Sequence, residues 1–321
     1  MNDLPLEQLI AYKPKRSEPV DFISFWETTL KEARAFPLQL RFERVDTGLH
    51  QLEVFDVTFR GFAGQPIKAW LILPRQRTGK LPCVVEFTGY GTGRGIPSDW
   101  LLWASVGYAH FVMDNRGQGP GMLNGDTVKR EPAEVEAENS NFVLRGILKP
   151  ETYYYRRLFT DAVRAVEAAR SHPAVDALHV AIDGISQGGG VTLAVSGLVT
   201  DLDAILPGVP FLCHYRKATE ISTREPYNEI SRYLNDHMEE RETVFSTLDY
   251  FDGLNFAAYA NAPALFSVGM LDGVCVPSTV FAAYNHYAGQ KEIRIWECDH
   301  MECGGNFWTV EKMKFLAKIW T

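Results

Sequence analysis

The chain has 321 residues, of which 46% are apolar and 22% charged, a composition that excludes a disordered or low-complexity protein. Acidic residues outnumber Lys and Arg by 40 to 32, giving a net charge of −8, so nucleic acid and anionic membranes are poor candidate partners. No signal-peptide pattern or membrane-length apolar run is present, and five cysteines without a CxxC pair predict reduced thiols in a cytoplasmic protein.

The predicted elements begin with a helix and a hairpin. Apolar residues recur at helical spacing within 21–35, whereas 54–59 and 67–73 are predicted strands joined by the turn-rich segment GFAGQP. From residue 83 onward, short apolar strands alternate with helices, as is typical of a mostly parallel sheet covered on both faces. The predicted strands are 83–87, 109–114, 179–183, 204–206, 264–268 and 293–296, and the predicted helices are 99–106, 154–169, the segment after Gln187, 279–287 and 310–320.

Two stretches interrupt this alternation. Residues 119–150 are acidic and loop-like, and residues 211–256 are polar and helix-prone. Neither has an obvious apolar core of its own, so both are predicted to be excursions over one face of the sheet. The sequence therefore predicts one domain over residues 1–321, with an N-terminal extension at 1–50 and a lid-like insertion at 211–256.

The segment GISQGGG contains the pattern G-x-S-x-G with Ser186 at its centre. A predicted strand precedes it and a predicted helix follows it. A nucleophile at such a tight strand-to-helix turn has a strained backbone, so the residues two positions before and after it must be small. A glycine-rich turn with an incidental serine is the alternative, but the context favours a serine nucleophile.

A serine hydroxyl needs a base that is held by an acid. In α/β-hydrolases the chain order is Ser, then Asp or Glu, then His. The histidines after Ser186 are His214, His237, His286 and His300. The first two lie in the polar insertion and the third in a predicted helix, whereas His300 follows the last predicted strand, where the base is expected. Asp272 follows the preceding strand and is the predicted acid, although the following Gly273 also suits a simple turn.

If Ser186 attacks a carbonyl carbon, backbone N–H groups must stabilise the oxyanion that forms. One predicted donor is the N–H of Gln187, directly after the nucleophile. The second is Tyr90, in the early glycine-rich loop TGYGTGRG. This loop lacks the G-x-x-x-x-G-K-[ST] pattern of a phosphate-binding loop, so phosphate binding is the weaker interpretation.

Cys298, His300 and Cys303 also suggest a metal site, with Cys275 as a fourth ligand. Their spacing is irregular and no pair has the short spacing of a zinc site. We therefore expect neither a metal nor another cofactor.

Two further residues have open roles. Trp103 is predicted to line a sugar or acyl pocket, although packing of its helix against the sheet explains it equally well. Arg116 is expected to fix local geometry through several hydrogen bonds rather than to contact substrate.

At the level of whole motifs, the chain resembles carbohydrate esterase family 7, the acetyl xylan esterases and cephalosporin C deacetylases. The resemblance covers nearly the whole chain and rests on GYGTGRG with DWLLW, MDNRGQG, GISQGGG, PGVPFLCHYRKA, SVGMLDGVCVPSTVFAAYN and KEIRIWE.

This resemblance implies an α/β-hydrolase with Ser186 as nucleophile, Asp272 as acid, and Tyr90 and Gln187 as oxyanion donors. It also implies a cytoplasmic, metal-free homohexamer. The active sites would face an internal cavity that admits short acetylated sugars and excludes polymers.

One position departs from the family pattern, which places His directly before Glu. Here the segment reads Asp-His-Met-Glu at 299–302, and an ungapped comparison puts Met301 where the family has its base. Either the loop is displaced by one residue, so that His300 supplies the imidazole, or the protein is a degenerate homologue with impaired catalysis. We favour the displaced loop, because a one-residue shift in a loop has a low energetic cost.

The motifs predict a serine hydrolase, and the resemblance implies an esterase that deacetylates small acetylated sugars such as xylo-oligosaccharides, with cephalosporin C as a further substrate. A serine peptidase or thioesterase of the same fold is one alternative, since a Ser-His-Asp triad does not select the acyl group. A catalytically silent homologue is the other.

Overall fold

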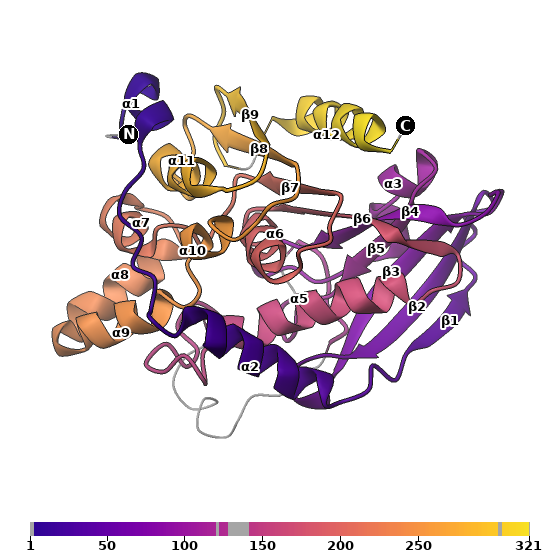
Figure 1. The fold of residues 1–321 in the computed structure, drawn as a ribbon, viewed down its shortest axis with the longest axis horizontal. Helices are drawn as coiled ribbons and strands as arrows, with labels where there is room; N and C mark the ends of the chain where they lie inside the picture. Colours follow the sequence, from indigo (N-terminus) through magenta and orange to yellow (C-terminus); the bar gives the residue numbers. More distant parts are fainter. Residues whose placement is uncertain (1–2, 120–121, 128–140, 301–303, 321) are drawn as a thin grey trace.

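The computed structural model describes residues 3–119, 122–127, 141–300 and 304–320 (Figure 1). A single nine-stranded sheet runs through the described part, in the order β1-β2-β3-β5-β4-β6-β7-β8-β9. In this order, the pairs from β1 to β3 are antiparallel, whereas all pairs from β5 through β4 to β9 are parallel. The strands are β1 (Arg41–Val45), β2 (Leu52–Arg60), β3 (Pro66–Pro74), β4 (Leu81–Phe87), β5 (Ala109–Met113), β6 (Val175–Ile185), β7 (Ala204–Gly208), β8 (Ala264–Gly269) and β9 (Lys291–Trp296).

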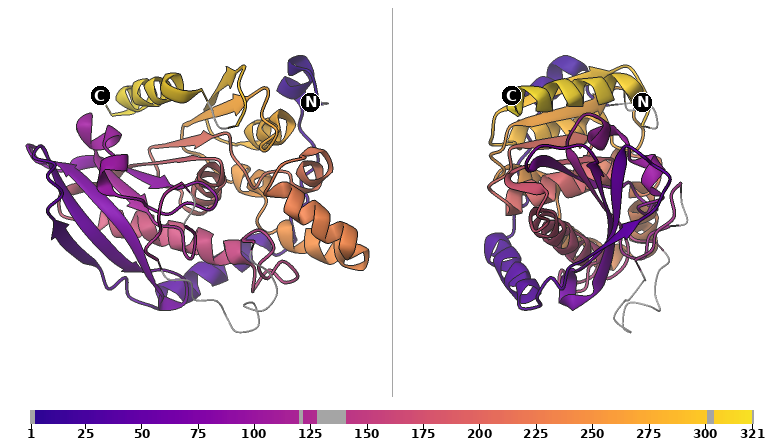
Figure 2. Two further views of the ribbon diagram at one scale, coloured as in Figure 1. Left: turned by 180° about the vertical axis from the view of Figure 1, so that it is seen from behind. Right: turned by 90° about the vertical axis from the view of Figure 1, so that its right-hand side faces the viewer.

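Helices cover both faces of the sheet (Figure 1). In both views of Figure 2 the indigo helix α2 and the yellow helix α12 lie on opposite sides of the molecule. The α-helices are α1 (Leu6–Ala11), α2 (Phe22–Arg34), α3 (Leu102–Ser105), α5 (Tyr154–Arg170), α6 (Gln187–Leu198), α7 (Tyr215–Ile221), α8 (Tyr227–Asp236), α9 (Arg241–Leu248), α10 (Gly253–Ala257), α11 (Pro277–His286) and α12 (Gly305–Ile319). Short 3-10 helices are η1 (Phe62–Gly64), η2 (Pro97–Asp99) and η3 (Met238–Glu240).

Successive side chains of the central strands pack alternately against the helices on the two faces of the sheet. On β4, Val85 and Phe87 pack into the large core beneath α5 and α6, whereas Val84 packs into a smaller cluster under α12. β6 follows the same rule, with Ile182 on the first side and Ala181 on the second. Successive side chains of a strand point to opposite faces, so a strand that is apolar throughout serves a sheet buried on both sides.

The structure confirms the predicted α/β architecture and the predicted strands. The helix expected at 99–106 is a single turn, α3, preceded by η2, and α12 begins at Gly305 rather than at 310. Helix α1 and strand β1 were not predicted. β1 has the sequence Arg-Phe-Glu-Arg-Val and forms an edge of the sheet, where charged residues replace the apolar alternation that identifies inner strands.

The insertion at 211–256 consists of helices α7 to α10 and follows the carboxyl end of β7. It therefore lies at the edge of the sheet where β6, β8 and β9 also end. Of the other interruption, 119–150, the segment 120–121 and the residues 128–140 lie outside the described residues. In its described remainder, Val143, Leu144 and Ile147 are buried in the core. Within the described ranges, no helix is long and apolar enough to cross a membrane.

Candidate active site

Ser186 stands between β6 and α6 with an unusual backbone conformation. Its φ is 59° and its ψ is −117°, a region that residues with a side chain rarely occupy. The conformation is held by hydrogen bonds, because the Ser186 N–H donates to Gly208 O at 2.9 Å and its carbonyl accepts from Gly190 N and Phe211 N. The strand-to-helix turn thus presents the serine hydroxyl at the carboxyl edge of the sheet.

The three predicted catalytic side chains form one hydrogen-bonded line. His300 Nε2 lies 2.9 Å from Ser186 Oγ, and His300 Nδ1 lies 2.7 Å from Asp272 Oδ2. The other carboxylate oxygen, Asp272 Oδ1, accepts from the backbone N–H groups of Val274 and Cys275 at 2.8 and 2.9 Å. Asp272 is fully buried, so these bonds fix its position and satisfy its charge.

The predicted oxyanion loop is joined to the elbow by two glutamine side chains. Gln118 Oε1 accepts from Gly91 N at 2.7 Å, and its Nε2 donates to Gln187 Oε1 at 3.0 Å. Gln187 Nε2 in turn donates to Gly89 O at 3.2 Å, and Tyr155 OH donates to Gln187 Oε1 at 3.0 Å. The loop that carries Tyr90 is therefore tied to the residue directly after the nucleophile. Sequence reasoning named the Gln187 backbone but missed these side-chain bonds, which join residues distant in the chain.

Arg116 has the structural role that the sequence favoured. Its guanidinium is buried and forms a two-point ion pair with Asp161 on α5. The carbonyl of Arg116 accepts from Tyr154 OH at 2.8 Å. Asp161 Oδ1 also accepts from Phe62 N at 2.8 Å, so this pair links α5, the β2–β3 connection and the loop after β5.

Trp103 is not where a substrate pocket requires it. Its side chain has no exposed surface and packs beside Trp308 and Leu316 on the α12 side of the sheet. The expectation of a pocket-lining role is therefore corrected in favour of helix packing. The aromatic cluster in the sequence did not distinguish the two roles, because both need large apolar rings.

The insertion contributes a side chain to the predicted oxyanion loop. Tyr90 OH accepts from the backbone N–H of Phe142 at 3.1 Å and donates to Glu229 Oε2, on α8, at 3.4 Å. Burial and the neighbouring Glu225 raise the pKa of Glu229 to about 7, although the Tyr90 hydroxyl and Arg232 oppose the shift. Nothing in the local sequence marks Glu229, which is one of many acidic residues in a polar segment.

Ligand-type side chains meet at the same place. Asp272, Cys275 and His300 have potential metal-ligating atoms within 4.8 Å of one another. His300, however, directs one ring nitrogen at Asp272 and the other at Ser186, so the arrangement suits proton transfer better than metal binding. Cys303 of the suggested metal set lies outside the described residues, whereas the side chain of Cys298 is buried.

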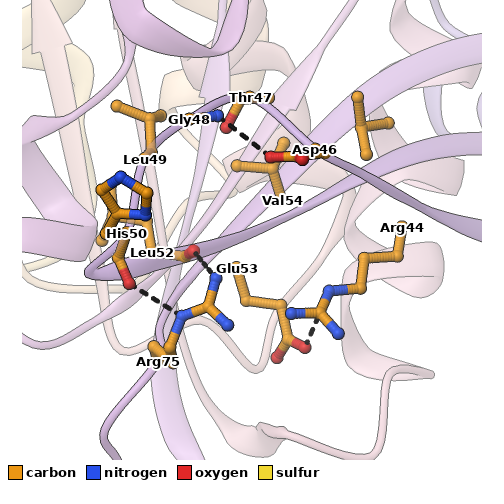
Figure 3. A pocket seen from close by; sticks show the side chains of 11 residues that line it. Arg44, Asp46, Thr47, Gly48, Leu49, His50, Leu52, Glu53, Val54 and Arg75 are labelled. Atoms are coloured by element: carbon orange, nitrogen blue, oxygen red, sulfur yellow. Dashed lines mark hydrogen bonds and ion pairs between the residues drawn. The ribbon is translucent and has the colours of Figure 1, made fainter.

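Two hollows elsewhere in the described part of the chain contain none of the predicted site residues. One of about 370 Å³ lies at the β1–β2 turn, where Arg75 donates to the carbonyls of His50 and Leu52 and Arg44 pairs with Glu53 (Figure 3). A second of about 640 Å³ lies along α2. The chemistry therefore gathers at the carboxyl edge of the sheet and not in these hollows.

Comparison with known proteins agrees with the fold and the motifs. The chain is 36% identical to an acetyl xylan esterase from Paenibacillus sp. R4, with a TM-score of 0.90 over 98% of this chain and 99% of that one. Acetyl xylan esterase 1 from Thermoanaerobacterium sp. JW/SL YS485 is 30% identical, with a TM-score of 0.89 over 99% and 100% of the two chains.

A curated relative, acetyl esterase Axe7A from Xylanibacter ruminicola, is 26% identical over 96% of this chain and 68% of its own length. The profile of the family described as acetyl xylan esterase (AXE1) matches residues 1–319. A match over almost the whole length, together with the resemblance to carbohydrate esterase family 7, establishes the family. The chain belongs to the acetyl xylan esterases.

Proposed function

We propose that this protein hydrolyses acetate esters on short acetylated xylo-oligosaccharides, with Ser186 as nucleophile, His300 as general base and Asp272 as its acid. The observation that carries the proposal is the hydrogen-bonded line from the buried Asp272 carboxylate through both ring nitrogens of His300 to Ser186 Oγ. A triad of this geometry is recognised by the roles of its atoms rather than by the fold that carries them.

The first half of the reaction forms an acyl-enzyme. Ser186 Oγ attacks the acetyl carbonyl while its proton passes to His300 Nε2. Asp272 keeps the Nδ1–H proton in place and stabilises the imidazolium. The backbone N–H groups of Tyr90 and Gln187 are the proposed donors to the oxyanion. Collapse of the tetrahedral intermediate breaks the bond to the sugar oxygen, which takes the proton from His300 and leaves as an alcohol.

The second half restores the serine. His300, again neutral, accepts a proton from water as the water oxygen attacks the acetyl carbon. The second tetrahedral intermediate expels Ser186 Oγ, which recovers its proton from His300, and acetate is released. The substrate class rests on the relatives, two of which are named acetyl xylan esterases. Activity on cephalosporin C, a cytoplasmic location and a homohexameric assembly stay predictions of the family resemblance.

Acetate release from p-nitrophenyl acetate and an acetylated xylo-oligosaccharide tests the proposal in wild type and in Ser186→Ala, His300→Ala and Met301→Ala. Removing a triad member of a serine hydrolase costs roughly 10⁴- to 10⁶-fold in kcat. We expect this loss for Ser186→Ala and His300→Ala but not for Met301→Ala. His286→Ala is the matched histidine control, because His286 bonds to Pro14 O from helix α11.

Three results would contradict the proposal. An inactive wild type whose Ser186 resists a fluorophosphonate label would indicate a silent homologue. Full activity of His300→Ala would indicate another base. A preference for an amide or a long-chain thioester over the acetate ester would favour the peptidase or thioesterase alternative.

A further inference from the structure

The insertion contacts the two loops that carry Asp272 and His300. Arg224 lies between α7 and α8, and its Nη1 is 2.8 and 2.6 Å from the two carboxylate oxygens of Asp299, the residue before His300. Two residues earlier, Ser222 Oγ donates to the carbonyl of Gly273 at 3.0 Å. One short stretch of the insertion thus reaches both loops.

The Asp299 carboxylate accepts hydrogen bonds from three segments of the chain. Besides Arg224, its Oδ1 accepts from the backbone N–H of His300 at 2.7 Å and from that of Gly273 at 3.4 Å. Gly273 directly follows Asp272, and its missing side chain leaves room for Arg224, since a Cβ there would lie 3.1 Å from Arg224 Nε. The three segments converge where the acid and the base must keep a 2.7 Å hydrogen bond.

We propose that Arg224 and Asp299 are positioning residues, through which the insertion holds the His300 loop in catalytic register with Asp272 and Ser186. The inference rests on the proposed function and names a part of that site. Asp299 directly precedes His300 and accepts from its backbone N–H, so its carboxylate stands where the chain enters the loop that supplies the base.

Stability alone does not explain this pair. The side chains of Arg224 and Asp299 are 50% and 38% exposed, and exposed ion pairs typically contribute about 0–1 kcal/mol to folding. Catalysis is more sensitive, because a misplacement of about 1 Å between reacting groups costs on the order of 100-fold in rate. The pair should therefore affect turnover far more than folding.

The test compares wild type with Arg224→Gln, Arg224→Lys, Asp299→Asn and the double variant Arg224→Gln/Asp299→Asn. kcat and KM are measured with p-nitrophenyl acetate, and the Tm of each protein is recorded. Arg216→Gln is the matched control, because it breaks an exposed ion pair with Glu242 that also lies on the insertion but touches neither loop.

We expect Arg224→Gln and Asp299→Asn each to lower kcat about tenfold, within the range that small misplacements produce, while KM changes less than about twofold. Arg224→Lys should recover part of the loss, and the double variant should be no worse than the poorer single variant, because both remove one interaction. Molar salt should lower the wild-type kcat toward that of Arg224→Gln, since it screens an exposed ion pair. Every Tm should stay close to that of Arg216→Gln.

The inference is overturned if an active wild type keeps its kcat in Arg224→Gln, if the two losses add in the double variant, or if Arg216→Gln loses as much activity. In each of these cases the proposed function stands. A wild type without turnover or serine labelling overturns the proposed function and this inference together.

Discussion

The glycines around Ser186 explain why this residue could be identified from the sequence. A Cβ added to Gly188 would lie 2.1 Å from Phe87 O, and one added to Gly184 would lie 2.4 Å from the Gly188 carbonyl group. The close approach of β4, β6 and α6 therefore requires glycine at both positions. Backbone packing requires the glycines of the motif, so the motif could be recognised from the sequence alone.

Other residues of the site have no such local pattern in the sequence. Gln118, Glu229 and Arg224 act through partners 69, 139 and 75 positions away in the chain, and each belongs to a common polar residue type. Their roles depend on which loops the fold brings together. His300 could be predicted from the sequence, because chain order and its place after a strand limit the candidate bases. The pocket-lining role predicted for Trp103 was wrong, because large apolar rings suit both a pocket and a core.

Glu229 should make the stability of the folded protein depend on pH. Its pKa is about 7 in the folded protein and near 4.5 when exposed, because burial and the adjacent Glu225 disfavour its charged form. The folded state therefore binds this proton more tightly than the unfolded state does. The stability that protonation contributes is complete below about pH 4.5 and is lost as the pH rises through about 7.

Glu229→Gln, which mimics the protonated form, should therefore resemble wild type near pH 5 and exceed it in stability by about 1–3 kcal/mol near pH 8.5. Urea unfolding at the two pH values measures the difference. Glu242→Gln, on an exposed side chain of the same insertion, is the control and should show no such trend. Equal stability of Glu229→Gln and wild type at pH 8.5 would refute the prediction.

Among the elements, helix α12 is anchored to the sheet by a buried charge. Lys312 Nζ contacts Asp183 Oδ2 on β6, three residues before the nucleophile. Nearby, the buried His110 pairs at 2.8 Å with Glu86, which is partly exposed. Burial raises the pKa of Asp183 to about 6, while Lys312 opposes the rise. The sequence predicted both elements but not the pair, since a lysine in a terminal helix usually faces solvent.

Lys312→Met should leave the Asp183 carboxylate buried without its cation. Removing one partner of a buried pair costs about 3–5 kcal/mol. The loss should be largest near pH 8 and smaller near pH 5, where Asp183 becomes neutral. The double variant Lys312→Met/Asp183→Asn should recover most of it. Urea unfolding at both pH values tests this, and a loss that is independent of pH would exclude an uncompensated carboxylate as its cause.

Across the whole molecule, one apolar core joins parts that the sequence separates. The large core includes Leu9 and Trp26 from the N-terminal extension, residues of the central strands, and Phe251 and Phe256 at the end of the insertion. Trp26 packs against these two phenylalanines with ring centroids 5.5 and 5.4 Å away, and its Nε1 donates to Tyr250 O at 3.0 Å. Neither excursion has a core of its own among the described residues, and we therefore propose a single domain over residues 1–321.

A single domain predicts one unfolding transition, with far-ultraviolet circular dichroism, tryptophan fluorescence and calorimetry giving the same midpoint. Trp26→Ala should lower this shared midpoint, because deleting a buried tryptophan costs about 3–5 kcal/mol. Ile23→Ala, on the same helix but 43% exposed, should change it little. If the extension or the insertion were a separate domain, Trp26→Ala would split the transition and leave the midpoint of the sheet unchanged. A common core predicts the opposite result. The cavity left by Trp26 would weaken packing that the extension, the sheet and the insertion share.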